Sequence, residues 1–136
     1  MALREEVDTK SFVLKALSLG KKVYLPRIHR REKQLGIYWI ERLSDLRRGP
    51  YGIYEPRPRK HYRGRPEELD LVVIPGLGFD RRGARLGRGQ GYFDQLLKKT
   101  KKAYKIGVAF REQIVKKIPV ARHDVCVDRV ITDEKG

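Results

Sequence analysis

Hydrophobic and polar positions along this chain follow two different periods, and each period predicts one type of element. Apolar residues recur at helical spacing over residues 9–19 and again over residues 92–99, which predicts two short helices. Gly20 follows the first segment and is a natural helix stop. The inward faces would be formed by Phe12, Val13, Ala16, Leu17 and Leu19 in the first helix and by Phe93, Leu96 and Leu97 in the second.

Short runs of aliphatic, aromatic and β-branched residues predict strands. They occupy residues 22–28, 36–41, 69–74, 104–110 and 128–132. The run from Leu69 to Ile74 is almost continuously apolar, which is typical of a strand buried on both faces of a parallel sheet, and Pro75 is expected to end it. The order of elements predicts an α/β fold with three layers, in which helices flank a mostly parallel sheet that includes residues 22–28, 69–74 and 104–110.

Residues 47–66 differ in composition from the rest of the chain, because Arg, Pro, Gly and Tyr dominate them. This composition predicts a long loop and not a helix or an interior strand. A solvated surface loop and a loop that folds over a ligand are both open interpretations. The chain length suits one hydrophobic core, so a single domain over residues 1–136 is expected.

The charge balance narrows the choice of partner. The 136 residues contain 32 Lys and Arg against 17 Asp and Glu, which gives a formal net charge of +15. An anionic partner is therefore expected, either nucleic acid or a small molecule with phosphate or carboxylate groups. A single cysteine, Cys126, excludes an intramolecular disulfide and a cysteine-rich zinc site. The sequence has neither a long apolar run nor a signal-peptide pattern, so a cytoplasmic location with no membrane partner is expected.

The segment RLGRGQGYFD, residues 85–94, is the most informative because it lies between a predicted strand and a predicted helix. Glycines at this density let backbone N–H groups approach an anion, and the following helix directs its positive dipole end to the same place. Arg85 and Arg88 add guanidinium groups suited to phosphate. Asp94 could hold Mg²⁺ against such phosphates, although an ordinary helix N-terminal acid is the simpler interpretation. The spacing matches neither a P-loop nor a dinucleotide fingerprint.

The longer segment PGLGFDRRGARLGRGQGYFDQLL resembles the signature of the 5-formyltetrahydrofolate cyclo-ligase family, also called 5,10-methenyltetrahydrofolate synthetases. The family pattern joins Pro-Gly, Phe-Asp, Arg-Leu-Gly and a Gly-rich end that leads into Gly-Tyr-Tyr-Asp. The positions that fit it are Pro75, Gly76, Phe79, Asp80, Gly83, Arg85, Leu86, Gly87, Gly89, Gly91, Tyr92 and Asp94.

The resemblance extends over almost the whole chain. Further matching segments are residues 6–9 (Glu-Val-Asp-Thr), 20–27, 51–56, 110–113 and 127–128. Three departures stand out: Gln90 replaces the family's usual Lys or Gly, Phe93 replaces its usual Tyr, and the family carries a further segment before the point that matches Met1. If the chain is complete as given, the lost strand would expose a sheet edge, and self-association is expected.

The resemblance implies a reaction in which ATP activates 5-formyltetrahydrofolate. The formyl oxygen would attack the γ-phosphate and displace ADP, nitrogen 10 of the folate would then attack the activated carbon, and phosphate would leave to give 5,10-methenyltetrahydrofolate. Mg²⁺ is the implied cofactor, and polyglutamylated folates are included among the substrates. Such chemistry needs positioning and charge neutralisation more than covalent catalysis.

The resemblance also implies site residues, of which Arg88 and Tyr92 are the catalytic candidates. Asp94 and Asp128 would hold Mg²⁺, although Asp128 is also explained as a turn carboxylate paired with Arg129 or Arg122. The implied folate-binding residues are Glu6, Tyr51 and Tyr92. The implied ATP-binding residues are Arg85, Gly87, Arg88, Gly89, Gln90, Gly91, Tyr92, Phe93 and Asp94.

Two other functions stay open. Arg and Tyr alternate through residues 47–65, a pattern that could pair with phosphates and stack on bases in an RNA- or DNA-binding module. A shortened or inactive relative of the family could instead bind nucleotide or folate without turnover.

Overall fold

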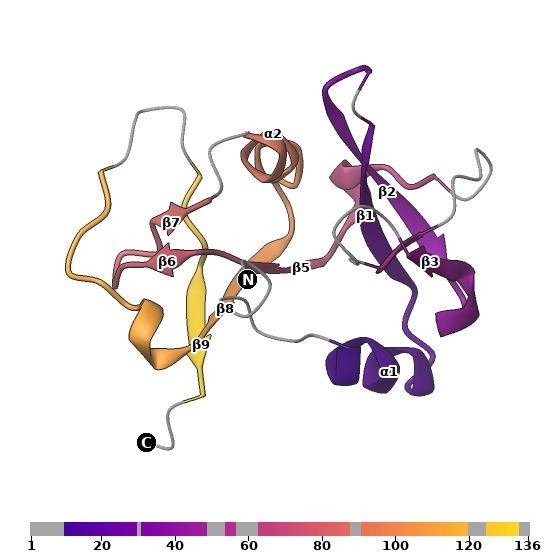
Figure 1. Ribbon diagram of the computed structural model, residues 1–136, viewed down its shortest axis with the longest axis horizontal. Coiled ribbons are helices and arrows are strands. Elements are labelled where there is room, and N and C mark those ends of the chain that lie inside the picture. The colour runs from indigo at the N-terminus through magenta and orange to yellow at the C-terminus, as the bar shows by residue number, and fades with distance from the viewer. Residues whose placement is uncertain are drawn as a thin grey trace. The chain divides into compact units, whose positions relative to one another are not determined.

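The computed structural model describes residues 10–29, 31–48, 54–56, 63–87, 91–119 and 125–133 (Figure 1). The chain divides into two compact units, one formed by residues 8–66 and the other by residues 67–136 together with 1–7. The predicted α/β class is confirmed, since a parallel sheet and helices are both present. The expectation of a single domain over residues 1–136 stays a prediction. Among the described residues, no helix is long and apolar enough to cross a membrane.

The unit formed by residues 8–66 is built around an antiparallel hairpin. Its strands, β1 (Val23–His29) and β2 (Gln34–Ile40), pair from Val23 opposite Ile40 to His29 opposite Gln34. The prediction that residues 22–28 belong to the parallel sheet is therefore wrong. The connection over residues 30–33 is long enough only for a hairpin, whereas a parallel pair needs a crossover of about a dozen residues. The unit's other elements are α1 (Lys10–Ser18), the 3₁₀ helix η2 (Leu43–Asp45), β3 (Leu46–Arg48) and β4 (Tyr54–Pro56).

Strand β2 supplies most of the described core of this unit. Ile37, Tyr38 and Ile40 are buried, and because neighbouring residues of a strand point to opposite faces, both faces of β2 are covered. The segment predicted to be a long loop contains a short two-stranded sheet, in which β3 pairs antiparallel with β4. The loop prediction therefore holds only in part.

The unit that begins at residue 67 contains the parallel sheet. Its strands run in the order β5 (Leu71–Pro75), β8 (Tyr104–Ala109) and β9 (Arg129–Thr132), and both pairs are parallel. All three strands were predicted, but Pro75 is the last residue of β5 and pairs with Val108. The connection from β5 to β8 contains a small hairpin and a helix. The hairpin consists of β6 (Gly78–Phe79) and β7 (Arg85–Leu86), and the helix is α2 (Tyr92–Lys99). The 3₁₀ helices η5 (Pro66–Glu68) and η6 (Arg111–Gln113) lie outside this connection.

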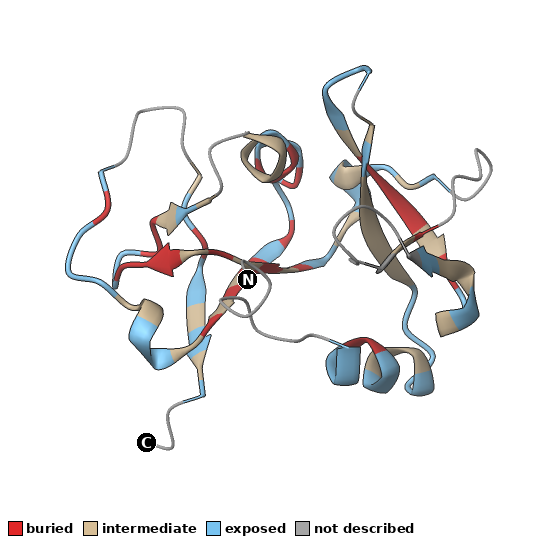
Figure 2. Cartoon of the chain, in the orientation of Figure 1, coloured by how far each residue is buried: buried red, intermediate tan, exposed pale blue. Residues whose placement is uncertain are grey.

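Strand β6 is buried (Figure 2), and its residue Phe79, with 0% of its surface exposed, belongs to the core of this unit. Its ring lies against Gly107 of β8, where a Cβ would come within 2.5 Å of Phe79 Cε1. The missing side chain at position 107 therefore makes room for the ring that anchors the β6–β7 hairpin to the sheet. The rest of the buried cluster consists of Val72, Ile74, Leu97, Ala103, Ala109 and Val127.

Candidate functional site

Arg85 links the carboxyl end of the sheet to the start of α2. Its Nε donates a hydrogen bond of 2.8 Å to the carbonyl of Pro75, the last residue of β5. Its guanidinium carbon lies 5.2 Å from the centre of the Phe93 ring, in the first turn of α2, within range of a cation–π contact. Ligands of open α/β sheets bind at the carboxyl ends of the strands, so Arg85 lies where a ligand is expected.

Two glycines of the same loop are required for different physical reasons. Gly91 caps α2 with φ of 75°, a left-handed conformation that residues with a side chain rarely adopt, although a Cβ there would meet nothing within 4 Å. A Cβ at Gly87, in contrast, would lie 2.7 Å from Nη1 of Arg85. Gly91 thus sets the backbone direction at the helix start, and Gly87 leaves room for the guanidinium.

The structure brings part of the predicted site together. Tyr92 and Asp94 are half-buried in the first turn of α2, next to Phe93. Within the described part of the chain, the Asp94 carboxylate has no hydrogen-bond or ion-pair partner. Five predicted site residues lie outside the described residues: Glu6, Tyr51, Arg88, Gly89 and Gln90.

Asp128 has a structural partner that the sequence did not indicate. Its Oδ2 accepts a 2.8 Å hydrogen bond from the backbone N–H of Lys105, and its own N–H donates to the Lys105 carbonyl at 2.7 Å. These bonds hold Asp128 beside the beginning of β8. No three metal-binding side chains gather among the described residues. A magnesium site formed by Asp94 and Asp128 therefore stays a prediction.

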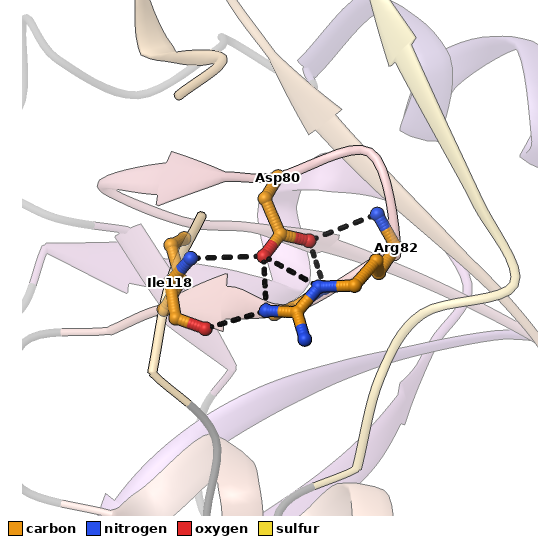
Figure 3. Close-up of polar contacts among 4 residues, drawn as sticks. Asp80, Arg82 and Ile118 are labelled. Atoms are coloured by element: carbon orange, nitrogen blue, oxygen red, sulfur yellow. Dashed lines mark hydrogen bonds and ion pairs between the residues drawn. The ribbon is translucent and has the colours of Figure 1, made fainter. Parts of the chain in front are cut away.

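Sequence reasoning missed the buried carboxylate that holds the β6–β7 turn. Asp80 is 1% exposed and accepts hydrogen bonds from the N–H groups of Ile118 (2.9 Å) and Ala84 (3.0 Å). It also accepts from the backbone N–H of Arg82 and forms an ion pair of 2.8 Å with the same residue's guanidinium (Figure 3). The turn leads into β7, so this network supports the strand from which Arg85 reaches Pro75.

The hydrogen bonds around Asp80 determine its acidity. Burial by itself would raise the pKa of the carboxyl, but the donors from Ile118, Arg82 and Ala84 outweigh it and lower the pKa from 3.8 to about 2. The carboxylate is therefore charged at neutral pH. The only signal in the sequence was its place in the Phe-Asp pair of the motif, which does not reveal a partner 38 residues away.

Gln113 braces the carboxyl edge of the sheet and was also not foreseen as a site residue. Its Nε2 donates to the Gly76 carbonyl at 3.1 Å, and its Oε1 accepts from the Phe110 N–H at 2.7 Å. One side chain thereby joins the loop after β5 to the loop after β8. Asp133, just beyond β9, accepts from the Arg111 N–H at 2.8 Å and extends this bracing across the sheet.

In the unit of residues 8–66, an ion pair joins two segments that matched the family separately. Arg27 of β1 and Glu55 of β4 approach to 3.0 Å, and their side chains are only 16% and 19% exposed. Arg27 also donates to the Pro56 carbonyl at 3.2 Å. The Leu-Pro-Arg segment, residues 25–27, and the Glu-Pro segment, residues 55–56, are therefore in direct contact in the fold.

The fold and the loop together define an α/β protein in which the chain leaves the parallel strand β5, forms the β6–β7 hairpin and then enters α2 after a Gly-rich segment. The family model for the 5-formyltetrahydrofolate cyclo-ligase family matches residues 1–133, and the chain belongs to that family. The family predicted from the sequence is thereby confirmed.

Named relatives and solved structures agree with this assignment. The chain is 33% identical to the mouse 5-formyltetrahydrofolate cyclo-ligase, over 98% of this chain and 71% of that protein. It is 33% identical to a probable 5-formyltetrahydrofolate cyclo-ligase of Caenorhabditis elegans, over 93% of this chain and 66% of that protein. The structure of 5,10-methenyltetrahydrofolate synthetase from Aquifex aeolicus matches with a TM-score of 0.78 and 34% identity, over 96% of this chain and 64% of that one. The synthetase from Mycoplasma pneumoniae matches with a TM-score of 0.67 and 26% identity, over 95% of this chain and 67% of that one. The chain thus spans about two thirds of the length of these relatives.

Proposed function

We propose that this chain catalyses the ATP-dependent conversion of 5-formyltetrahydrofolate to 5,10-methenyltetrahydrofolate. Family membership over residues 1–133 supports the reaction class. The observation that carries the proposal is the position of Arg85, held between the carboxyl end of β5 and the first turn of α2. A cation held at a helix N-terminus suits the phosphate chain of ATP.

The role of the Gly-rich loop in this reaction is to position ATP and neutralise its charge. The guanidinium of Arg85 is restrained by Pro75 and Phe93, so little side-chain freedom is lost when a phosphate binds. The left-handed Gly91 directs the N–H groups at the start of α2 towards the same ligand. Arg88 and Tyr92 are the residues we propose to contact the transferring phosphate, and Gly87, Gly89, Gln90 and Phe93 complete the ATP site.

Magnesium fits the donor set at the start of α2. In ATP sites the ion is held by one or two carboxylates together with phosphate oxygens, and the carboxylate of Asp94 has no partner among the described residues. Mg²⁺ would neutralise the phosphates during transfer. Asp128 is the second carboxylate implied by the resemblance, but its hydrogen bonds with Lys105 hold it at the amino ends of β8 and β9, whereas Arg85 lies at the carboxyl end of β5, so the carboxylate that we propose at the start of α2 is Asp94.

The folate side of the proposal comes from the family resemblance. Glu6 would accept from the pterin N–H groups, and Tyr51 and Tyr92 would line the ring pocket. We also propose that polyglutamylated folate is a substrate, that the chain self-associates and that its location is cytoplasmic. A relative from Arabidopsis is named as mitochondrial.

The direct test is the ATP- and Mg²⁺-dependent appearance of the methenyl chromophore from 5-formyltetrahydrofolate with the purified chain. Arg88→Ala should weaken ATP binding or slow turnover by about 10- to 100-fold, since a charge-assisted phosphate contact contributes about 1.5–3 kcal/mol. Arg59→Ala is the matched control, because it removes the same charge at a position outside the segment 85–94.

The outcomes separate the proposal from its alternatives. Equal effects of Arg88→Ala and Arg59→Ala that vanish at moderate salt would contradict the phosphate-binding role, because exposed charges are screened by salt. Saturable binding of ATP and folate without the chromophore would indicate a family member that binds but does not turn over. Steeply salt-dependent binding of oligonucleotides without ATP binding would favour the nucleic-acid interpretation.

A further inference from the structure

A second candidate ligand site lies in the unit of residues 67–136, apart from the Gly-rich loop. It is an open cavity of about 340 Å³ between the turn after β6 and strand β9. None of its lining residues belongs to the segment 85–94, and it shares only Asp128 with the predicted site residues. The lining is formed by residues 80–83 of this turn, by Ile114, and by residues of β9 and of the segment before it.

The charge of this cavity favours an anion. Three arginines line it against two aspartates, and one of these, Asp80, is already paired with Arg82. Within the described part of the chain, Arg81 and Arg129 have no acidic partner. Apart from the Asp80–Arg82 ion pair, the charged lining therefore consists of two arginines and one carboxylate, that of Asp128, whose Oδ2 accepts from a backbone N–H.

Arg82 is held in place at the wall of this cavity. Its Nε and Nη2 bond the carboxylate of Asp80, and Nη2 also donates to the Ile118 carbonyl at 2.8 Å. Figure 3 shows its third nitrogen on the side turned away from the carboxylate, and the side chain is 50% exposed. A guanidinium that is fixed on one side and accessible on the other loses little freedom on binding an anion.

The remaining lining is partly apolar. Ile114, Val127 and Val130 contribute hydrocarbon surface, and Thr132 lies on the same face of β9 as Val130. An apolar surface next to a fixed cation suits an organic anion better than an inorganic one. We propose that this cavity binds a small organic anion, whose phosphate or carboxylate group contacts Arg82 and whose apolar part lies on Ile114, Val127 and Val130.

The probes are phenyl phosphate, benzoate and inorganic phosphate. Their binding is monitored through the backbone amide signals of the full chain in NMR titrations. We expect saturable shifts at Gly83, Val127 and Val130, with phenyl phosphate binding more tightly than inorganic phosphate. Tighter binding of phenyl phosphate than of benzoate would identify a phosphate ligand, and the reverse order a carboxylate ligand. Both orders support the site.

Variants test the contact with Arg82. Arg82→Gln should weaken phenyl phosphate binding by about tenfold, which is the effect of losing one charge-assisted hydrogen bond. Because Arg82→Gln could also loosen the Asp80 turn, the double variant Arg81→Gln/Arg129→Gln, at two exposed positions, gives a second test with an expected loss of about fivefold. Lys101→Gln removes a charge from an exposed turn outside the cavity and should change the affinity less than about twofold.

Three results would overturn the proposal. The first is the absence of saturable shifts at Gly83, Val127 and Val130 with all three probes. The second is a set of shifts confined to Gly87 and the first turn of α2, which would mean that the anions bind only at the proposed ATP site. The third is an equal effect of the cavity variants and Lys101→Gln. ATP binding is measured in parallel on the same three variants. Because the Gly-rich loop is unchanged in all of them, ATP binding should not change, and a failure of this proposal can be told apart from a failure of the proposed function.

Discussion

Replacing the buried carboxylate of Asp80 tests the physical account of the β6–β7 turn. In Asp80→Asn, one side-chain oxygen becomes an NH₂ group, which faces either the backbone N–H groups of Arg82 and Ala84 at the Oδ1 position or the Ile118 N–H and the Arg82 guanidinium at the Oδ2 position. The variant loses the ion pair with Arg82 and leaves buried N–H groups without an acceptor. The carboxylate is buried but the Arg82 side chain is 50% exposed, so the cost comes mainly from the buried N–H groups left without an acceptor, at about 1–3 kcal/mol of unfolding free energy.

The pKa of Asp80 gives a second magnitude for the same hydrogen bonds. A shift from 3.8 to about 2 corresponds to about 2.5 kcal/mol of stability from the ionised carboxylate. Because the pKa is lower in the folded state, this stability is fully present above pH 4 to 5 and is lost as the pH falls towards 2. By pH 3 the loss should be about 1 kcal/mol.

Urea unfolding of the wild type and Asp80→Asn at pH 7, 5 and 3 measures both effects. The difference in unfolding free energy should be largest at pH 7 and smaller by about 1 kcal/mol at pH 3. Asp70→Asn is the control: Asp70 is paired with Lys102 at 3.3 Å, but its side chain is 89% exposed, so a change below about 0.5 kcal/mol is expected. An Asp80→Asn variant as stable as Asp70→Asn at pH 7, or one whose deficit does not change with pH, would refute this reasoning.

Three further predictions concern other parts of the fold. Gly107→Ala should lower the unfolding free energy by about 1–3 kcal/mol in urea titrations, because the new Cβ would displace the Phe79 ring, and a loss near zero would mean that the ring moves freely. A double-mutant cycle with Arg27→Gln and Glu55→Gln should give a coupling free energy of about 1 kcal/mol, since the pair is largely buried, and additive single effects would contradict this link between β1 and β4. Burial, together with a neighbouring arginine, lowers the pKa of His29 from 6.5, so the neutral form is favoured in the folded state and the melting temperature should fall as the pH drops below 6.5. His29→Gln should reduce this dependence, and an unchanged pH profile would rule out the contribution of His29.

The sequence by itself determined the elements whose signals are local. The helix predicted at residues 92–99 is α2, Tyr92–Lys99, because Gly91 and the spacing of Leu96 and Leu97 define it without reference to the rest of the chain. The apolar run that begins at Leu69 identified a strand of the parallel sheet for the same reason, but the expected burial on both faces is wrong, because β5 is an outer strand of the described sheet, Val72 and Ile74 are buried, and Leu71 on the other face is exposed. The Gly-rich motif identified the family, since its residues are adjacent in the chain.

Only the tertiary structure decided which segments meet. The residues 22–28 were correctly predicted as a strand, but a strand's own side chains do not reveal its partner, and the short connection to β2 made the pair an antiparallel hairpin. The role of Asp80 depends on a backbone N–H from Ile118, and that of Arg85 on a carbonyl at the end of β5 and a ring in α2. Arg27 and Glu55 likewise meet across 28 residues. Residue type and spacing record local preference, whereas these contacts depend on how distant backbone segments pack, and that packing is a property of the folded chain as a whole.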